Sequence, residues 1–539
     1  MISTLYSSLV TSRSTPGKAS GRHSPRLAAR RWLTLSALGG ASLLVYWIGL
    51  ILPYNLFALR FKPLLDIAKL TRDKPVAQAG FVLTFAALSG LYYLAWRTCR
   101  PASAGPEATH SVPPQSPRAM WAVLVVSLLA IHLSMLWLYP IDAADLFDNI
   151  SRGRITARHG GNPFYDTPRD YAQDPFRGYV AWPGTTSAYG PLWELLAAGT
   201  SRIAGDGKLA NVLGFKLLGL LFYGGCVALI AGILNRHAPE RALQGVCLFA
   251  WNPLVIYETA GNGHNDIVMV FFILLGVWAL LRGHFTSAAL ALVAGALIKF
   301  IPILLLPVAL AAGLRTLPTR RRRIYFLLIT FLACAILITA SFAPFWRGGD
   351  ILGLQRRASL FTTSLPAVVQ AQLEPSLGAE VSQWIVARVA AAALLMGAVV
   401  LLQTWRTWRR PGWLSPVRAS AHILLFYLLF TCLWFQQWYA LWPLALAAIL
   451  PEGATARLAV LLSYAALWKT IIFDYFLYRG GPLPPRVWRE SLLGPATLGL
   501  AWLYAAYVRI ANSRWRVASW RPDRRPLSIS NQQSEISNL

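Results

Sequence analysis

Residues 209–234, LANVLGFKLLGLLFYGGCVALIAGIL, contain a single charged side chain, Lys216. About 20 apolar residues are enough for an α-helix to cross the hydrocarbon core of a membrane, so this run predicts a transmembrane helix. Similar runs recur along the whole chain, at 33–52, 77–96, 120–140, 242–258, 266–281, 324–345, 384–404, 419–435, 458–477 and 491–510. Of the 539 residues, 56% are hydrophobic and 13% are charged, which excludes a soluble enzyme with one membrane anchor.

Three shorter apolar runs affect the expected number of spans. Residues 285–300 and 301–314 are separated by a Lys-Phe-Ile-Pro break, which indicates a bent or re-entrant pair. Residues 438–450 follow the polar pair Gln436-Gln437. We therefore predict an all-α, polytopic transmembrane helical bundle of about 11–14 spans, some of them short or re-entrant.

The net charge of +28 comes largely from basic clusters beside the apolar runs. Basic residues precede the first span, occupy connections at 320–323 and 406–418, and follow the last span at 509–525. Cytoplasmic loops are rich in Lys and Arg, so the charge indicates topology rather than a nucleic-acid partner. Both termini are then cytoplasmic, and 141–208 is a large external loop. The basic loop 53–76 contradicts this scheme unless it lies in the interface as an amphipathic segment.

The same reasoning divides the chain into three parts. Residues 1–32 are a basic cytoplasmic N-terminal tail, 33–510 are the transmembrane domain, and 511–539 are a cytoplasmic C-terminal tail. The first apolar run is expected to be a retained span, because no small-residue cleavage site follows it. Residues 101–117 are expected to be a flexible linker. The five cysteines show neither a disulfide framework nor metal-ligand spacing.

The external loop opens with Asp142, Asp145 and Asp148, which recur at every third position. If the segment were helical, they would lie within about 120° of one face. Acids at a membrane surface are costly and usually functional. One could serve as a general base that takes a proton from an attacking hydroxyl, and a neighbour could raise its proton affinity or orient it. The alternative is a trio of solvated loop acids.

A polar turn, Gly261-Asn-Gly-His-Asn-Asp266, interrupts two apolar runs. His264, Asn265 and Asp266 offer donors and acceptors that suit a hydroxyl-rich ligand, and the glycines let the backbone approach it. The alternative is a turn capped by Asn265. The turn is not a nucleotide-binding fingerprint, because it lacks the third glycine and the preceding strand.

Lys299 is a charge in an otherwise uncharged run, so it could bind a phosphate or extend to the interface. Arg154 could hold a phosphate in a guanidinium fork. Gln437 lies among aromatic residues that could stack on a sugar or form an interfacial belt. A base, a cation and aromatic platforms together suit transfer of a sugar from a lipid phosphate to a hydroxyl. The lack of a Rossmann or P-loop pattern fits such a membrane-borne donor.

The order of these motifs resembles the GT-C superfamily of membrane glycosyltransferases, and within it the polyprenol-phosphate-mannose-dependent mannosyltransferases of bacteria. The resemblance covers about residues 120–345 and rests on Asp145-Leu-Phe-Asp-Asn-Ile-Ser-Arg-Gly-Arg154, Gly161-Asn-Pro-Phe-Tyr165, Tyr189-Gly-Pro191, Gly263-His-Asn-Asp266 and Lys299-Phe-Ile-Pro302. The C-terminal third matches only as a string of spans.

The resemblance implies an inverting transfer in which an acid of the external loop activates the acceptor. Carried over by motif, Asp145 is the base and Asp142 its neighbour, while Lys299 and Arg154 hold the donor phosphate. The full set of residues expected to bind substrates is Asp148, Arg154, Tyr189, His264, Asn265, Asp266, Lys299 and Gln437. Many relatives pair their acids as adjacent residues or as Asp-x-Asp, so the wider spacing here leaves open which acid is the base.

We therefore predict a glycosyltransferase of the bacterial cytoplasmic (plasma) membrane. It moves a hexose, expected to be mannose, from a polyprenyl-phosphate donor to a glycan or glycolipid acceptor at the outer face. No metal site or other cofactor is predicted, although a divalent cation could replace Lys299 or Arg154 in balancing the phosphate. The alternatives are a polytopic transporter or lipid flippase, and a transferase of a non-sugar group. A transporter would line a path through both halves of the bundle with charges, whereas the non-basic charges here gather on one side.

Overall fold

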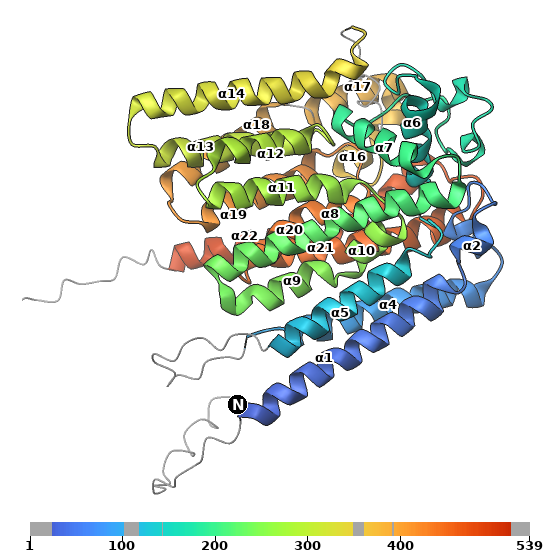
Figure 1. Cartoon of the computed structure of the whole chain (residues 1–539), viewed down its shortest axis with the longest axis horizontal. Helices are drawn as coiled ribbons and strands as arrows, with labels where there is room; N and C mark the ends of the chain where they lie inside the picture. The colour runs from blue at the N-terminus through green and yellow to red at the C-terminus, as the bar shows by residue number, and fades with distance from the viewer. Residues whose placement is uncertain (1–23, 102–117, 143, 349–360, 391–392, 519–539) are drawn as a thin grey trace, which may run out of the picture.

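The computed structural model describes residues 24–101, 118–142, 144–348, 361–390 and 393–518. These residues form helices and connecting loops, without a strand among them. The fold class predicted from the apolar runs is confirmed: the protein is an all-α polytopic bundle (Figure 1).

The helices of the first half are, in order, α1 (Ser24–Tyr46), η1 (Trp47–Ile51), α2 (Leu56–Leu59), α3 (Ile67–Leu70), α4 (Pro75–Thr98), α5 (Arg118–Met135), α6 (Asp145–His159), η2 (Pro168–Asp170), η3 (Arg177–Tyr179), α7 (Pro191–Ala204), α8 (Lys208–His237), η4 (Pro239–Arg241), α9 (Ala242–Ala250), α10 (Pro253–Ile256), η5 (Tyr257–Gly261) and α11 (Asp266–Leu281). Those of the second half are α12 (Phe285–Ala296), η6 (Ile301–Leu305), α13 (Leu306–Thr316), α14 (Arg320–Phe342), η7 (Ala343–Phe345), α16 (Leu365–Leu377), α17 (Ala379–Ala390), α18 (Ala393–Arg409), α19 (Leu414–Phe426), η9 (Tyr427–Thr431), η10 (Gln437–Ala440), α20 (Leu441–Ile449), α21 (Ala454–Ile471), η11 (Ile472–Tyr478) and α22 (Arg486–Ala518).

Within the described residues, eight helices are long and apolar enough to cross a membrane. They are Arg31–Ile51, Pro75–Thr98, Arg118–Met135, Lys208–His237, Arg320–Phe345, Leu414–Thr431, Ala454–Tyr478 and Arg486–Ile510. A ninth candidate is the pair Pro253–Gly261 and Asp266–Leu281, which is bent by 119° at the polar turn. The count is lower than predicted, because several apolar runs form helices too short to span about 30 Å. The Lys-Phe-Ile-Pro break does separate α12 from η6 and α13, as expected.

The tails predicted at the two ends fall partly in helices. α1 begins at Ser24, where Pro25 occupies the first turn and residues 27–31, Leu-Ala-Ala-Arg-Arg, favour a helix. At the other end α22 continues to Ala518. Residues 1–23 and 519–539, and most of the predicted linker, lie outside the described residues.

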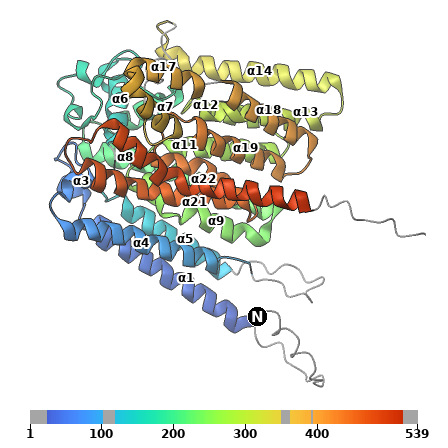
Figure 2. The same cartoon turned by 180° about the vertical axis from the view of Figure 1, so that it is seen from behind.

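The helices of the large loop and of the connection 53–76 lie at one end of the bundle. α2, α6 and α7 lie there in Figure 1, and α3 lies at the same end in Figure 2. We call this the loop end. The start of α1 and the end of α22 lie at the opposite end, as do the connections from α13 to α14 and from α18 to α19. The large loop after α5 and the two described chain ends are therefore on opposite sides of the bundle.

Lys216, the one charge in the apolar run 209–234, is fully buried and anchors the start of the large loop. Its Nζ donates to the carbonyl oxygens of Met135 and Leu136, each at 3.4 Å, and of Leu138. These carbonyls end α5, where a cation compensates the unpaired acceptors of a helix C-terminus. Lys216 therefore has a structural role, and it fixes the chain just before the acids of the loop.

Candidate functional site

The acids of the large loop lie in two different environments at the loop end. Asp142 precedes α6, and its backbone N donates a hydrogen bond to Asn262 Oδ1 at 3.4 Å. Its carboxylate accepts hydrogen bonds from Gln437 Nε2 and, at 3.1 Å, from Thr470 Oγ1. Burial, with Glu258 nearby, raises the pKa of Asp142 to about 7. The expectation that all three acids share one helical face is wrong for Asp142, because α6 begins only at Asp145.

Asp145 is the first residue of α6 and is half-buried. Among the described residues, none donates a hydrogen bond to its carboxylate. Burial raises the pKa of Asp145 above its usual range, whereas the nearby charges of His264 and Lys299 lower it. Asp145 is thus a carboxylate with raised proton affinity and no competing protein donor, which is what a general base requires.

Asp148, one turn later, is buried and fully engaged with the protein. It accepts hydrogen bonds from the backbone N–H groups of Ala181, at 3.1 Å, and Trp182, at 3.4 Å. Arg152 Nη2 lies 3.6 Å from it as an ion pair. These contacts tie the loop before α7 to α6, and they favour a structural role over the predicted contact with substrate.

Arg154 is also buried among protein partners. Its Nε donates to Asp174 at 2.8 Å, its Nη1 to the carbonyl of Gly205 at 2.9 Å, and its Nη2 to Asp206 at 3.0 Å. Phe176 lies beneath the guanidinium at 5.3 Å. With all three nitrogens engaged, Arg154 holds the loop to the start of α8, and this placement favours structure over phosphate binding.

Lys299 lies in an aromatic box at the start of the break after α12. Its Nζ donates to Asp266 Oδ2 at 2.8 Å and lies 5.4 Å from the ring centre of Tyr189, 4.6 Å from that of Tyr439 and 5.8 Å from that of Trp442. Trp442 Nε1 donates to the other oxygen of Asp266 at 2.7 Å. Aromatic faces stabilise a cation within about 6 Å, so the box holds Lys299 in one place.

Tyr189 reaches this box because the following Gly190 packs directly on the chain before Lys299. Gly190 N donates to Ile298 O at 2.9 Å, and Leu192 N donates to Leu297 O at 3.0 Å. A Cβ at Gly190 would lie 2.2 Å from the carbonyl oxygen of Leu297. The Tyr-Gly-Pro motif therefore requires glycine for a close approach between two backbones.

Gly190→Ala is expected to lower the melting temperature of the purified protein by several degrees and to reduce activity, because the two backbones must separate. The free energy of unfolding should fall by about 1–3 kcal/mol, the usual range for overpacking. Gly199→Ala is the matched control, since Gly199 lies within α7 and a Cβ there meets nothing within 4 Å. Its melting temperature should stay the same or rise. Equal effects of the two substitutions would contradict the close approach.

The polar turn lies between η5 and α11, where Gly263 adopts a φ of +72° that favours glycine. The His264 ring stacks on Trp438, with 3.7 Å between ring centres and 20° between planes. His264 Nδ1 lies 2.8 Å from Glu258 Oε2. Several buried polar atoms here have no hydrogen-bond partner within the described part of the chain, among them Glu258 Oε1, His264 Nε2 and Asn265 Nδ2. Such atoms are rare in folded proteins, and their clustering indicates a binding site for a polar ligand.

Lys469 was not singled out from the sequence, yet it organises one side of the site. It is buried in α21, and its Nζ donates to Gln436 Oε1 at 2.7 Å and to Gln437 Oε1 at 2.9 Å. The Gln437 amide is thereby oriented with its nitrogen toward Asp142. A charge inside the apolar run 458–477 was the signal that could have identified Lys469, as it identified Lys299.

The structure thus brings most of the predicted site residues together and separates two from them. The residues that lie around the polar turn and the aromatic box are Asp142, Asp145, Tyr189, His264, Asn265, Asp266, Lys299 and Gln437. Asp148 instead contacts the loop before α7, and Arg154 contacts the loops on both sides of α7. Across the residues that the structure describes, no group of three His, Cys, Asp or Glu side chains is arranged to hold a metal ion. The arrangement brings together a half-buried carboxylate, a cation 2.8 Å from its counter-ion and buried polar atoms without hydrogen-bond partners among the described residues.

Comparisons with known proteins agree on one family. The model of a family described as alpha-(1->6)-mannopyranosyltransferase, N-terminal domain, matches residues 32–315, a little over half of the chain. Alpha-(1->6)-mannopyranosyltransferase A of Mycobacterium tuberculosis is 24% identical over 374 residues, which cover 66% of this chain and 69% of that protein.

Two relatives from Corynebacterium glutamicum match over shorter stretches. Alpha-(1->6)-mannopyranosyltransferase B is 26% identical over 151 residues, 27% of this chain and 24% of that protein. Alpha-(1->6)-mannopyranosyltransferase A is 23% identical over 193 residues, 35% of this chain and 38% of that protein. The family match at 32–315 includes the acids, the polar turn and Lys299, while Gln437 and Lys469 lie beyond it.

Proposed function

The chain belongs to the alpha-(1->6)-mannopyranosyltransferase family, and from this premise we propose that it transfers a mannosyl group from a polyprenyl-phosphate donor to a hydroxyl of a glycan or glycolipid acceptor. The observation that carries the proposal is the free carboxylate of Asp145. It lies within electrostatic reach of both Lys299 and the polar turn at His264. The residues that we propose as base, phosphate-binding cation and sugar-binding turn thus lie close to one another.

In the proposed reaction, Asp145 takes the proton from the acceptor hydroxyl as its oxygen attacks the anomeric carbon of the donor sugar. The bond from that carbon to the phosphate oxygen breaks, and the lipid phosphate leaves with the electron pair. Attack opposite the leaving group inverts the anomeric configuration, so a β-linked donor gives an α-linked product. Lys299 stabilises the growing negative charge on the phosphate, and the surrounding rings limit the access of water.

The polar turn is proposed to bind the sugar. Glu258 Oε1 can accept from a sugar hydroxyl, and Asn265 Nδ2 can donate to one. Trp438 and Tyr439 present ring faces of the kind on which sugars stack. Because Glu258 Oε1 and Asn265 Nδ2 are buried and have no hydrogen-bond partner within the described residues, a ligand that supplies hydroxyls in the right geometry would satisfy them.

The proposed topology places the loop end at the outer face of the cytoplasmic membrane and both termini in the cytoplasm. It is supported by the basic clusters at Arg320–Arg323 and Arg406–Arg410, which lie at the end opposite the site, where the described chain ends also lie. A membrane-impermeant thiol reagent should label a cysteine introduced at exposed Trp182 in intact cells. Labelling only after the cells are broken would reverse the orientation.

The first test of the function is transfer of radiolabelled mannose from synthetic polyprenyl-phosphate mannose by membranes that contain the protein. A radiolabelled glycan or glycolipid should appear, and membranes without the protein should give none. Lipid-phosphate glucose and arabinose serve as alternative donors. If none of the three donors gives product, the proposed transfer is wrong, and the transporter alternative gains weight.

At pH values below the pKa of Asp142, Lys469→Met is expected to reduce the rate of transfer about tenfold or more. The Lys469 charge lowers that pKa, which lies at about 7, so its removal raises the pKa and favours the neutral acid at a given pH. The acidic limb of the pH–rate profile should therefore move to higher pH. Lys469→Arg keeps the cation and should retain the wild-type profile more closely. If the acidic limb of the pH–rate profile does not move in Lys469→Met, the contacts that join Asp142, Gln437 and Lys469 have no part in the mechanism.

A further inference from the structure

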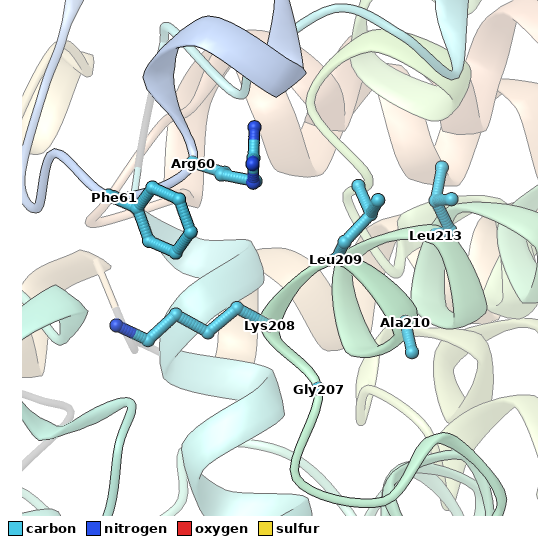
Figure 3. A pocket seen from close by; sticks show the side chains of 7 residues that line it. All are labelled: Arg60, Phe61, Gly207, Lys208, Leu209, Ala210 and Leu213. Atoms are coloured by element: carbon cyan, nitrogen blue, oxygen red, sulfur yellow. The ribbon is translucent and has the colours of Figure 1, made fainter.

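An open groove at the loop end is separate from the site described above. It has a volume of about 710 Å³ and lies between the chain after α2 and the first turns of α8 (Figure 3). Arg60 and Phe61 line one wall, and Lys208, Leu209 and Leu213 line the other. The groove thus combines two cations with an apolar surface.

Neither cation has an acidic partner within the described part of the chain. Lys208 Nζ donates to the Tyr179 hydroxyl at 3.2 Å and lies 4.7 Å from the ring centre of Tyr179 and 5.9 Å from that of Phe61. Arg60 bonds to the carbonyl of Phe57, and its guanidinium lies 4.4 Å above the Phe61 ring. Tyr179 Oη also donates to the carbonyl of Arg60 at 2.9 Å, which holds the two walls of the groove together. Both positive charges therefore lie beside the Phe61 ring at the rim of the groove (Figure 3).

The apolar wall continues from the groove along α8. Leu213, Leu217 and Leu221 follow one another at every fourth position, so they share one face of the helix. Leu217 is 49% exposed and Leu221 is 71% exposed. Since α8 is a candidate membrane span, this exposed face provides a path for a hydrocarbon chain that begins at the groove.

The groove lies where spans meet the membrane surface. α8 begins at Lys208, and the span that includes α1 ends at Ile51, shortly before Arg60. The connection 53–76 carries five basic and two acidic residues, on the side that the positive-inside rule would leave poor in cations. An anionic partner at this surface would account for that exception, because lipid phosphates attract clustered Lys and Arg.

We propose that this groove binds an anionic phospholipid, with its phosphate at the rim beside Arg60 and Lys208 and an acyl chain along Leu209, Leu213 and Leu217 of α8. The two cations supply charge complementarity, and the exposed leucines supply the apolar surface that a free phosphate would not use. Lys208 contacts Tyr179, whose ring packs 5.2 Å from Phe147 of α6. Two side chains thus connect the groove to the helix that begins with Asp145.

The test measures binding of phosphatidylglycerol and phosphatidylcholine to the purified full-length protein by native mass spectrometry. The groove variant is Arg60→Gln with Lys208→Gln. The control is Lys62→Gln with Lys74→Gln, which removes the same charge from exposed positions of the same connection. Melting temperatures are measured for both, and Arg60→Gln alone replaces the groove variant if the double change does not fold.

The wild type and the control should bind phosphatidylglycerol at least tenfold more tightly than phosphatidylcholine, and the groove variant should lose this preference. Inorganic phosphate at the same concentration should not compete. Equal losses in both variants would show a diffuse charge effect and overturn the proposal, as would the absence of any preference in the wild type. Full competition by inorganic phosphate would replace the lipid site with an anion site. None of these readouts depends on mannosyl transfer, so they stand apart from the proposed function.

Discussion

Asp145→Asn is expected to abolish mannosyl transfer while the protein inserts and folds normally. Positioned general bases contribute about 10²–10⁴-fold to rate, and an amide of the same shape cannot take the acceptor proton. No described residue depends on the Asp145 carboxylate for a hydrogen bond, so the melting temperature should stay within about 2 °C of the wild type. The measurement is initial rate with lipid-phosphate mannose, beside the melting temperature in detergent.

Asp148→Asn is the matched control, because it makes the same change one turn later on α6. The neutral amide loses the ion pair with Arg152 and weakens the hydrogen bonds from Ala181 and Trp182, so this variant should lose stability by about 1–3 kcal/mol. Asp145→Asn should therefore lower the rate of transfer with little loss of stability. Asp148→Asn should lower the stability more than the rate. Substantial rate in Asp145→Asn would exclude Asp145 as the base and direct attention to Asp142.

Lys299→Gln should weaken donor binding by about 10–100-fold, the range of a charge-assisted hydrogen bond to phosphate. The substitution also leaves the carboxylate of Asp266 buried without its cation, so the melting temperature should fall. These two effects have different causes, and a single variant cannot separate them. The measurements are the donor KM and the melting temperature.

The double variant Lys299→Gln with Asp266→Asn separates them. With both charges removed, the unpaired buried carboxylate is gone, and much of the stability should return. Donor binding should stay weak, since no cation is left for the phosphate. If the double variant recovers donor binding together with stability, Lys299 serves only to neutralise Asp266.

A charge that interrupts an apolar run indicated Lys299 from the sequence, and the same signal applies to Lys469. The signal is not specific, because Lys216 interrupts the run 209–234 in the same way and has a structural role. The acids of the loop were indicated by their spacing in a polar segment between two apolar runs.

Neither signal could assign Arg154, because the residues that engage it, Asp174 and Asp206, become its partners only when the loop folds back on α6. An arginine motif reads the same whether its partner is a phosphate or a protein carboxylate.

The all-α fold class was predictable from the apolar runs, whereas the number of membrane spans was not. Hydropathy detects burial, but it does not tell whether an apolar run is buried by lipid or by other helices. α9 and α20 are apolar, with every residue of each helix buried against the protein. The contact of Gln437 with Asp142 was equally hidden, since it joins residues far apart in the chain through tertiary packing alone.

The hydrogen bond from Thr470 to Asp142 joins residues 328 positions apart, and it has a consequence for biosynthesis. At about 5–20 residues per second, ribosomes need on the order of 15 s to 1 min to make the chain between them. Throughout that time the first acid of the loop is already at the membrane without Gln437, Lys469 or Thr470. A nascent or prematurely terminated chain that ends near residue 315 would contain the whole family-matched region and still lack the support of Asp142. The contacts of Asp142 with α21 can therefore form only when nearly the last helix has been inserted.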